Sequence, residues 1–467
     1  MDAQEYKLLH EKYMQNNNGS TITDTFVAIV PSFFTTFITV NILVVSKPLE
    51  LPAQFLVEFL LNIFFVILNV TVLHVELWEI TGSLFVIAAS ATVRQLYKLT
   101  YLTPFIQIRT KRPGYLAMTR STINLLTAIC ILAVDFRCFP RSLAKTETFG
   151  FGLMDTGVGL FVYSNAIISS EIKPITRQKL TLNKLKGLLV QNSPLLALGM
   201  MRFFVINELD YQQHVSEYGV HWNFFLTLAA TKIVGTIILS IISTAEHIKY
   251  VAILLLVVHE TALQLGLSNY VLSDVPRTSF VAANREGLLS INGYVALYMA
   301  SILVGSFLKT DATVVNARTL FKQAGKLAMF SILLWKLTYL CRDMFGVSRR
   351  LANMGYVVWI LSIGTTMTAL YMLLEIFYHY LVFHKPATSD EDTPESRTCV
   401  PVILQAIEYN GLAFFLAANI LTGLINMTFQ TLLVGCGGAV FLLTVYMFVL
   451  AAITLFLFVN KIKLKFW

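Results

Sequence analysis

Residues 437–459 read GGAVFLLTVYMFVLAAITLFLFV, a run that contains no Asp, Glu, Lys or Arg. A helix of this length crosses the hydrocarbon core of a bilayer, which requires about 20 apolar residues. Similar runs recur along the whole chain of 467 residues, of which 56% are hydrophobic and only 13% are charged. Because the runs do not alternate apolar and polar residues, they do not fit a membrane β-barrel. The sequence therefore predicts an all-α polytopic integral membrane protein.

The apolar runs predict a bundle of about 13 transmembrane helices. We expect them near residues 25–45, 53–74, 80–97, 119–134, 149–169, 187–206, 221–243, 247–267, 288–307, 326–341, 353–383, 411–432 and 437–459. The third and tenth spans are the least well defined, because they are short or interrupted by charge. This division leaves residues 1–24 as an N-terminal tail, residues 25–459 as one multi-span domain and residues 460–467 as a C-terminal tail.

Lys and Arg are concentrated in three loops, at residues 94–120, 173–186 and 309–326. Basic loops of membrane proteins tend to face the cytosol. All three loops share that side if the N-terminal tail is luminal and the C-terminal tail is cytosolic. The charge pattern predicts this orientation, so the net charge of +8 reports membrane topology and not a nucleic-acid partner.

Both termini carry features that agree with this orientation. The tripeptide Asn-Gly-Ser begins at Asn18, which makes that side chain a candidate glycosylation site in the lumen. Lys461, Lys463 and Lys465 lie in the C-terminal tail. The last two of these lysines have the spacing of a dilysine-type retrieval signal for the endoplasmic reticulum. An ordinary basic anchor at the membrane surface is the alternative.

The segment from residue 135 to residue 155 concentrates charge between two apolar runs. It carries Asp135, Arg137, Arg141, Lys145, Glu147 and Asp155. Charge at or inside the membrane boundary is costly, and it therefore usually marks a functional site. The alternative is a solvated loop whose charges pair with one another.

Two members of this cluster have complementary chemistry. The carboxylate of Asp135 is suited to take a proton from a hydroxyl group, and the ammonium of Lys145 is suited to stabilise negative charge on an acyl oxygen. Arg137 and Arg141 are candidates to hold a phosphate through paired hydrogen bonds. Salt bridges within the loop are the structural alternative for all four side chains.

Asp155 lies about one turn inside the fifth predicted span. Gly152 and Gly159 share its helical face, and small residues at these positions allow a neighbouring helix or a lipid chain to approach closely. We therefore expect a channel for an apolar chain beside the charged cluster. Close packing of helices on the two glycines is the alternative.

Two further polar groups precede predicted spans on the same side of the membrane. His221, Trp222 and Asn223 open the seventh span, where His221 is an alternative general base and Trp222 an ordinary interfacial anchor. Asn284 and Arg285 precede the ninth span. These residues are candidate substrate ligands.

The motifs of several soluble enzyme classes do not occur in the sequence, among them the phosphate-binding GxxxxGK[ST], the zinc-binding HExxH and the nucleophile motif GxSxG. The five cysteines are scattered and have no metal-ligand spacing. We therefore expect no metal site and no permanently bound cofactor.

Seven segments of the chain resemble, in order, the inositol acyltransferase family of GPI-anchor biosynthesis, which includes animal PIG-W and the fungal GPI-anchored wall transfer proteins. The matching segments are Asp135-Phe136 with Phe139-Pro140-Arg141, Ala144-Lys145-Thr146-Glu147-Thr148, Met154-Asp155-Thr156-Gly157-Val158-Gly159, Glu217-Tyr218-Gly219-Val220-His221-Trp222-Asn223-Phe224-Phe225, Asn284-Arg285-Glu286-Gly287, Ser348-Arg349-Arg350-Leu351-Ala352-Asn353 and Asn410-Gly411 with Ala418-Asn419-Ile420-Leu421-Thr422-Gly423-Leu424-Ile425-Asn426. The pair Arg137-Cys138 departs from the family pattern, in which apolar residues are more typical, and this puts a phosphate role for Arg137 in doubt.

The resemblance implies a multi-span acyltransferase domain in the membrane of the endoplasmic reticulum. It implies transfer of a fatty acyl group, typically palmitoyl, from acyl-CoA to the 2-hydroxyl of the inositol ring of glucosaminyl-phosphatidylinositol. The implied partners are these two substrates and membrane lipids, with other GPI-pathway enzymes as further candidates. Because no Ser or Cys nucleophile with an adjacent base is evident, we expect direct transfer rather than an acyl-enzyme.

Combining these motifs with the resemblance gives a candidate site. Asp135 and Lys145 are expected to be catalytic. The expected substrate-binding residues are Arg141, Glu147, Asp155, His221, Trp222, Asn223, Asn284 and Arg285. The expected acyl-chain channel is formed by Gly152, Val158, Gly159, Phe161 and Val162.

Two other classes of function remain as alternatives. A secondary transporter of a small polar solute would use the charged cluster as its binding site, but internal symmetry and broken spans, which are typical of such folds, are not evident. A non-catalytic scaffold would leave the charged cluster unexplained.

Overall fold

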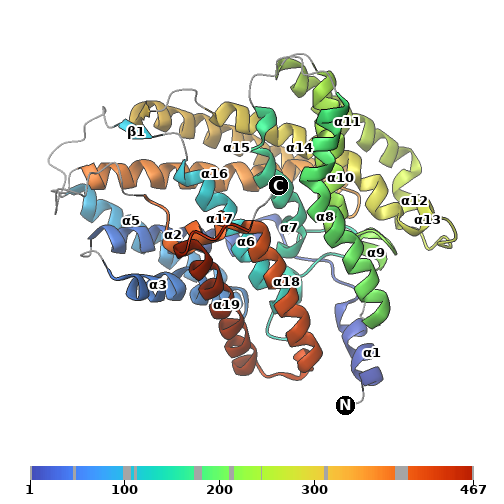
Figure 1. Ribbon diagram of the computed structural model, residues 1–467, viewed down its shortest axis with the longest axis horizontal. Helices are drawn as coiled ribbons and strands as arrows, with labels where there is room; N and C mark the ends of the chain where they lie inside the picture. Colours follow the sequence, from blue (N-terminus) through green and yellow to red (C-terminus); the bar gives the residue numbers. More distant parts are fainter. Residues whose placement is uncertain are drawn as a thin grey trace.

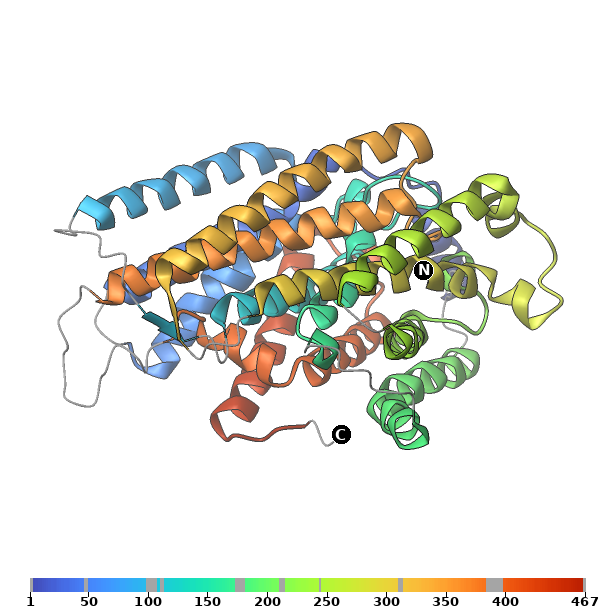
Figure 2. The same ribbon diagram turned by 90° about the horizontal axis from the view of Figure 1, so that it is seen from above.

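The computed structural model describes residues 3–45, 49–97, 107–109, 113–172, 181–209, 215–242, 245–309, 314–383 and 398–464, and most of these residues are helical (Figures 1 and 2). The α-helices are α1 (Ala3–Met14), α2 (Ile22–Val45), α3 (Leu51–Phe59), α4 (Phe65–Val70), α5 (Leu77–Tyr97), α6 (Gly114–Ala133), α7 (Thr156–Ala166), α8 (Leu182–Leu209), α9 (Val215–Tyr218), α10 (Phe224–Ile241), α11 (Ala245–Ala262), α12 (Ser268–Leu272), α13 (Phe280–Ala283), α14 (Arg285–Leu308), α15 (Ala317–Phe345), α16 (Met354–Phe383), α17 (Val402–Tyr409), α18 (Gly411–Thr428) and α19 (Cys436–Val459). Shorter elements are the π-helices η1 (Leu60–Phe64) and η6 (Leu263–Leu267), the 3-10 helices η2 (His74–Glu76), η3 (Arg141–Leu143), η4 (Leu153–Asp155), η5 (Ser170–Ile172) and η7 (Thr431–Leu433), and the strands β1 (Gln107–Arg109) and β2 (Val314–Asn316).

Eleven helices among the described residues are long and apolar enough to cross a membrane. The expected all-α polytopic class is therefore confirmed, whereas the expected count of about 13 spans is not. The predicted span at 187–206 lies within α8, which contains Pro194 and is not among the eleven. In the predicted span at 149–169 the only α-helix is the short α7, of 11 residues, which follows the 3-10 helix η4.

The short helix α7 has a physical explanation in its burial. Eleven residues of α-helix rise only about 16 Å, about half of the hydrocarbon core. The segment nevertheless extends from Asp155, which contacts Arg349, to Ile167, which packs against Gly305 near the end of α14. Irregular backbone is tolerated at membrane depth where protein covers it, and nearly every residue of α7 is buried.

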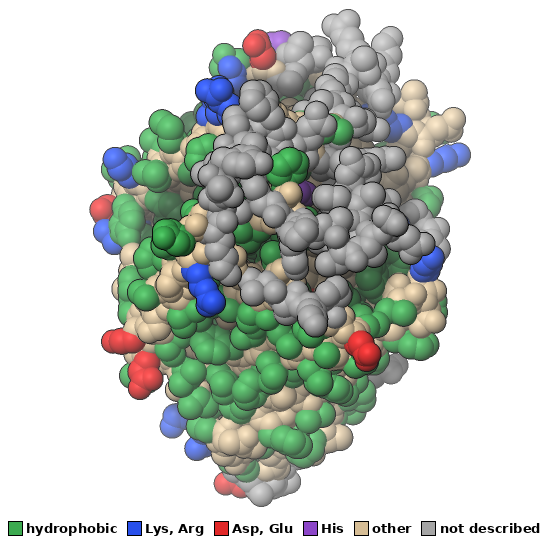
Figure 3. All heavy atoms as spheres, turned by 90° about the vertical axis from the view of Figure 1, so that its left-hand side faces the viewer, with side chains coloured by type: hydrophobic (Ala, Val, Ile, Leu, Met, Phe, Trp, Pro, Cys, Tyr) green, Lys and Arg blue, Asp and Glu red, His purple; other side chains and the backbone are tan. Residues whose placement is uncertain are grey.

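The centre of the molecule is α16, whose sequence is apolar on all sides. A helix with this pattern is stable where other helices surround it. The helices α2, α6, α7, α14 and α15 all pack against α16, and its side chains Trp359 and Tyr371 are completely buried. In Figure 2, α5, α15 and α16 extend along the long axis of the molecule. On the face shown in Figure 3, hydrophobic side chains form a broad area, with charged side chains mainly towards the edges.

Two ends of the bundle are distinguishable. The antiparallel pair β1–β2 joins Gln107 to Asn316 and so brings two of the predicted basic loops together. In Figure 1 this pair lies at the left end, whereas α1, α12 and α13 lie to the right. The charged segment at 135–155 lies away from the strands, on the side of α1.

Carboxylates inside the bundle hold helix N-termini of neighbouring segments. Glu375 of α16 accepts hydrogen bonds from the N–H groups of Gly114 and Tyr115 (3.1 and 2.8 Å) at the start of α6. Glu58 of α3 likewise accepts hydrogen bonds from Val402 and Ile403 (both 2.8 Å) at the start of α17. Helix N-termini have unpaired N–H groups and favour negative charge, so these buried carboxylates join elements far apart in the sequence.

The N-terminal residues before α2 contain helix α1 and contact the charged segment. The N–H of Ser20 donates to the carbonyl of Phe151 (2.7 Å), and the N–H of Glu147 donates to the carbonyl of Asn17 (3.0 Å). Asn18 is exposed. The proposed division at residues 24 and 459, the luminal position of this end and the glycosylation of Asn18 stay predictions.

Candidate active site

The charged segment forms an irregular loop between α6 and α7, and it packs on a second loop at 346–353. The N–H of Gly150 donates to the carbonyl of Val347 (2.9 Å), and the Ser348 hydroxyl donates to the carbonyl of Thr148 (2.5 Å). Backbone groups that lack helical partners are therefore satisfied between the two loops. This pairing fixes the position of the charged side chains.

A buried ion pair joins the two loops. The Arg349 guanidinium Nε donates to Asp155 Oδ1 at 2.8 Å, and the two side chains are only 3% and 1% exposed. The other carboxylate oxygen accepts the N–H of Thr146 (3.0 Å), and the Tyr356 hydroxyl donates to the Asp155 carbonyl (2.8 Å). Burial lowers the pKa of Arg349, but the nearby carboxylates of Glu217 and Asp155 have the larger effect. The pKa of Arg349 therefore lies above its ordinary value.

Lys145 belongs to the same network. Its Nζ donates to Glu217 Oε2 at 2.9 Å, and the other oxygen of Glu217 lies 4.0 Å from Arg349 Nη2. The Lys145 side chain remains 39% exposed. Two cations and two carboxylates therefore lie in contact, with the ammonium of Lys145 at the accessible side of the group.

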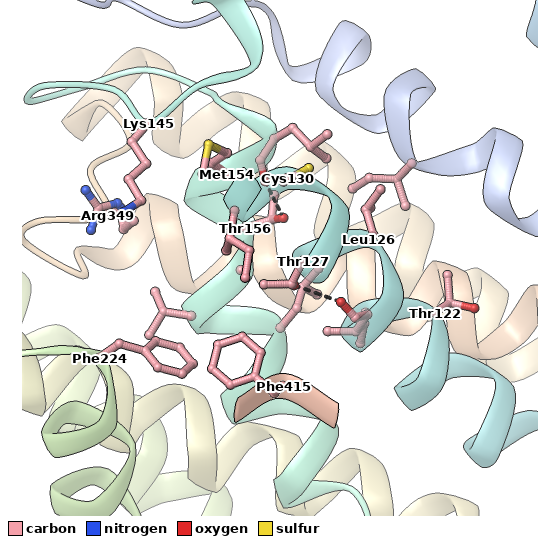
Figure 4. Close-up of a pocket in the computed structure, with 18 of the residues that line it drawn as sticks. Thr122, Leu126, Thr127, Cys130, Lys145, Met154, Thr156, Phe224, Arg349 and Phe415 are labelled. Atoms are coloured by element: carbon pink, nitrogen blue, oxygen red, sulfur yellow. Dashed lines mark hydrogen bonds between the residues drawn. The ribbon is translucent and has the colours of Figure 1, made fainter. Parts of the chain in front are cut away.

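A cavity of about 140 Å³ begins at this network. Lys145, Glu217, Tyr218 and Arg349 form its polar end. The remaining lining residues are mostly apolar and come from α2, α6, α7, α10, α16, α18 and the loop before α7: Ile29, Thr122, Ile123, Leu126, Thr127, Cys130, Ile131, Leu153, Met154, Thr156, Gly157, Val158, Leu160, Phe224, Phe225, Gly364, Met367, Phe415 and Asn419. Figure 4 shows Lys145 and Arg349 together on one side of this cavity and Thr122 on the opposite side.

This arrangement suits a substrate with an apolar chain and a reactive polar head. The chain would occupy the apolar part, because burial of apolar surface contributes about 25 cal/mol per Å². A developing negative charge on the head would then lie near the cations of Lys145 and Arg349, whose effect is stronger where water is excluded. The site is therefore suited to acyl transfer.

Asp135 lies next to the cavity and not in its lining. Its Oδ2 accepts the amide N–H of Asn426 at 2.7 Å, and its Oδ1 lies 3.6 Å from His10 Nε2. Ile131, one turn before Asp135, and Asn419, two turns before Asn426 on α18, both line the cavity. The pair of Asp135 and Asn426 thus continues the cavity wall between α6 and α18.

Arg141 and Glu147 contact the N-terminal residues. Arg141 donates to the carbonyl of Met14 (3.0 Å), and its guanidinium carbon lies 5.0 Å from the ring centre of Tyr13. Burial lowers the pKa of Arg141 below its ordinary value, although Tyr13 opposes the shift. Glu147 Oε2 accepts the N–H of Asn16 (3.0 Å). Neither residue lines the described cavity.

The predicted ligands at 221–223 lie beside the network, where they shape the backbone. The His221 ring stacks on Phe280, with 6.3 Å between ring centroids. Trp222 Nε1 donates to the Thr227 hydroxyl (2.9 Å), and Asn223 caps α10 by accepting the N–H groups of Phe225 and Leu226 (3.1 and 3.2 Å). In the described residues these three side chains do not line the cavity, but they position Phe224 and Phe225, which do.

Asn284 and Arg285 also hold backbone groups. Asn284 Oδ1 accepts the N–H groups of His221 and Trp222 (2.7 and 3.0 Å). Arg285 is 1% exposed and donates to three carbonyls of the segment after η6, among them that of Val275 at 2.9 Å. These contacts fix two loops on the same side of the bundle as Glu217.

The predicted channel residues divide into two groups. Val158 lines the cavity, and so does its neighbour Gly157. Phe161 packs on the rings of Phe224 and Phe415, with centroids 5.5 and 5.0 Å away. Phe161, like Gly152, Gly159 and Val162, is buried and lies outside the described lining.

The two predicted glycines have packing contacts instead. Gly159 faces α16, since its N–H donates to the Tyr356 hydroxyl (3.1 Å) and a Cβ there would lie 2.6 Å from Ile360. A Cβ at Gly152 would clash with the carbonyl oxygen of Ala144. Close approach of backbone and helices therefore explains both glycines.

Sequence reasoning did not select Glu217, Tyr218 and Arg349, which form the polar end of the cavity. A signal was present for Arg349, because Arg349 and Arg350 place positive charge on the predicted luminal side, against the usual bias. A basic pair that breaks this bias merits attention as a candidate site.

Comparisons with known proteins identify the family of this chain. A family model described as GWT1 matches residues 6–457. The chain is 35% identical to the GPI-anchored wall transfer protein 1 of Yarrowia lipolytica, over 76% of this chain and 74% of the relative. It is 34% identical to the GPI-anchored wall transfer protein 1 of Schizosaccharomyces pombe, over 71% and 69%, and 30% identical to the phosphatidylinositol-glycan biosynthesis class W protein of Dictyostelium discoideum, over 100% of both chains. The chain therefore belongs to the GWT1 family.

Proposed function

We propose that this protein transfers a fatty acyl group, typically palmitoyl, from acyl-CoA to the 2-hydroxyl of the inositol ring of glucosaminyl-phosphatidylinositol in the membrane of the endoplasmic reticulum. Membership of the GWT1 family supports a role in GPI-anchor biosynthesis and does not favour the alternative of a solute transporter. The observation that carries the proposal is the cavity, in which a mostly apolar chamber ends at Lys145 and Arg349.

The acyl chain of the donor would occupy the apolar chamber. Leu126, Phe415 and Met367 are among its lining residues and come from three different helices. The thioester would then lie at the polar end, close to the ammonium of Lys145. The inositol hydroxyl would approach from the side of Asp135, on which the acceptor lipid enters.

The reaction would proceed by direct transfer. Asp135 takes the proton of the inositol hydroxyl as its oxygen forms a bond to the thioester carbonyl carbon. Negative charge develops on the carbonyl oxygen, and Lys145 stabilises it there, with Arg349 adding to the positive potential. The carbon–sulfur bond then breaks, the thiolate of CoA leaves, and the proton on Asp135 is available to neutralise it.

The remaining network residues would act through these groups. Glu217 holds the Lys145 ammonium at 2.9 Å, and Asp155 fixes Arg349. Holding reactants and catalytic groups in one geometry supplies a large share of rate acceleration. Arg141 and Glu147 hold Met14 and Asn16 of the N-terminal residues, and they would act on the acceptor head group through this contact.

Release of CoA tests this proposal. The purified protein in lipid nanodiscs, given palmitoyl-CoA and glucosaminyl-phosphatidylinositol, should release free CoA thiol only when the acceptor lipid is present. Lys145→Ala should reduce this release by about 10²-fold or more, since a preorganised charge partner of the oxyanion is lost. Thiol release that is independent of the acceptor would contradict direct transfer to the lipid.

A further inference from the structure

The residues before α2 contact both of the proposed catalytic residues. We call residues 6–20 the N-terminal clamp. His10 Nε2 lies 3.6 Å from Asp135 Oδ1. Further along the clamp, the Asn17 amide donates to the carbonyl of Lys145 at 2.9 Å. The clamp therefore contacts Asp135 at its carboxylate and Lys145 at its backbone carbonyl.

The clamp is anchored on two different parts of the molecule. At its start, the Tyr6 hydroxyl lies 3.1 Å from the Thr431 hydroxyl and accepts the N–H of Leu432 at 3.1 Å, in the connection between α18 and α19. At its end, Ser20 pairs with Phe151. In Figure 1, α1 lies at the lower right, near the marked N-terminus. The two anchors lie on either side of the loop contacts of α1 and the residues after it.

The carboxylate of Asp135 lies between two partners from different elements. Asn426 of α18 donates to Oδ2 at 2.7 Å, and His10 of α1 approaches Oδ1 at 3.6 Å. The Asp135 side chain is only 12% exposed. With one neighbour on each oxygen, the carboxylate plane is restricted from both sides.

We propose that the N-terminal clamp completes the active site and that His10 is a positioning residue for Asp135. This inference rests on the proposed function and assigns to the clamp a part of that same site. An imidazole with its proton on Nε2 directs this N–H at Oδ1, while Asn426 holds Oδ2. The orientation of the general base towards the acceptor hydroxyl is thereby set. Hydrogen bonds of catalytic groups are often long before substrate binds and tighten in the complex, which accommodates the 3.6 Å separation.

Steady-state kinetics of the full-length protein test this role. His10→Leu keeps an apolar side chain in place of the ring and removes the donor, and His10→Gln restores an amide donor. We expect His10→Leu to lower kcat by about 10- to 100-fold, because small displacements of reacting groups have effects of this size. The KM for palmitoyl-CoA and the midpoint temperature of unfolding should stay close to those of the wild type. His10→Gln should regain most of the lost kcat.

Two control variants separate positioning from a purely structural role. Tyr6→Phe removes the hydroxyl that anchors α1 and leaves the His10 ring, and Glu5→Ala changes an exposed side chain of α1 that lies outside the clamp. Glu5→Ala should retain wild-type kinetics, and Tyr6→Phe should reduce the unfolding temperature more than kcat. A kcat loss in Tyr6→Phe equal to that in His10→Leu would overturn the positioning role.

Other outcomes also decide the question. A folded His10→Leu protein with wild-type kcat overturns the inference. A loss of kcat in His10→Gln equal to that in His10→Leu also overturns it, because it would mean that His10 does not act as a hydrogen-bond donor. If His10→Leu does not accumulate, the kcat of His10→Gln is compared with that of Tyr6→Phe instead. A near-normal kcat is expected for His10→Gln. A wild-type protein without acyl transfer refutes the proposed function itself, whereas an active wild type beside an equally active His10→Leu refutes only the clamp.

Discussion

The pair of Asp155 and Arg349 shows how single residues hold this site together. Each charge is almost completely buried, and each has the other as a partner. Removal of one member of a buried ion pair leaves an uncompensated charge, which costs about 3–5 kcal/mol. The sequence predicted Asp155 as a substrate ligand, and the structure adds a contact with Arg349 across 194 residues of sequence.

Asp155→Ala should therefore lower the unfolding temperature of the purified protein markedly, because Arg349 loses its nearest carboxylate. Glu147→Ala in the same loop is the control, since the Glu147 side chain is exposed. It should change stability by about 1 kcal/mol or less. Thermal unfolding in detergent, followed by the loss of folded monomer, measures both. Equal stability of the two variants would contradict the importance of the buried pair.

The chemical roles of Asp135 and Lys145 give a second prediction at this scale. Loss of a general base costs about 10²–10⁴ in rate and leaves the fold intact. Asp135→Asn and Lys145→Ala should each abolish most acyl transfer at normal protein abundance, measured as acylated lipid per molecule of enzyme. His221→Ala should have a smaller effect, since His221 stacks on Phe280 outside the described cavity lining. An inactive His221→Ala beside an active Asp135→Asn would reassign the base to His221.

At the scale of elements, α7 contributes both to the cavity lining and to the packing against the central helix α16. Its first turn presents Gly157 to the cavity, with no atom within 4 Å of an added Cβ. Two residues later, Gly159 packs on Tyr356 and Ile360 of α16. The two glycines are close in sequence and differ in what surrounds them, so they form a matched pair of test positions.

Gly157→Leu should fill part of the cavity and reduce acyl transfer by about 10-fold or more, because the donor chain is displaced. Its stability should not fall, since replacing Gly within a helix is favourable by about 1 kcal/mol. Gly159→Ala should show the reverse pattern, with reduced stability from overpacking against α16. Activity and unfolding temperature of both variants measure this contrast. A fully active Gly157→Leu protein would mean that the acyl chain binds elsewhere.

The elements also show what the sequence can and cannot predict. The long apolar runs predicted most spans, because the requirement for about 20 apolar residues is local to each run. The same criterion failed at 149–169, where only Thr156–Ala166 forms an α-helix. Burial of α7 inside the bundle depends on α14 and α16, which lie far away in the sequence, so no local pattern reports it.

The residues of the candidate site likewise include some that the sequence predicted and others that only the structure shows. Lys145 and Val158 were predicted from nearby sequence and line the cavity. Glu217, in α9, and Arg349, in the loop at 346–353, complete its polar end but lie 72 and 194 residues away in sequence from their partners in the first loop. The role of such residues follows from tertiary packing of loops, which composition and spacing do not encode.

At the scale of the whole molecule, the orientation in the membrane determines which compartment supplies each substrate. The basic loops predict a luminal N-terminus and a cytosolic C-terminus. A glycosylation reporter inserted in the N-terminal residues should therefore be modified in cells, and the same reporter fused after Trp467 should not. The opposite pattern would place the site of Lys145 and Asp135 on the cytosolic face.

The identity of the reaction product tests the central claim most directly. Purified wild-type protein should convert palmitoyl-CoA and glucosaminyl-phosphatidylinositol into a lipid that is heavier by one palmitoyl group. Fragmentation in the mass spectrometer should locate that group on the inositol ring, and Lys145→Ala should yield little of this product. A well-folded wild-type protein that forms no such lipid, or that acylates the glucosamine instead, would contradict the account.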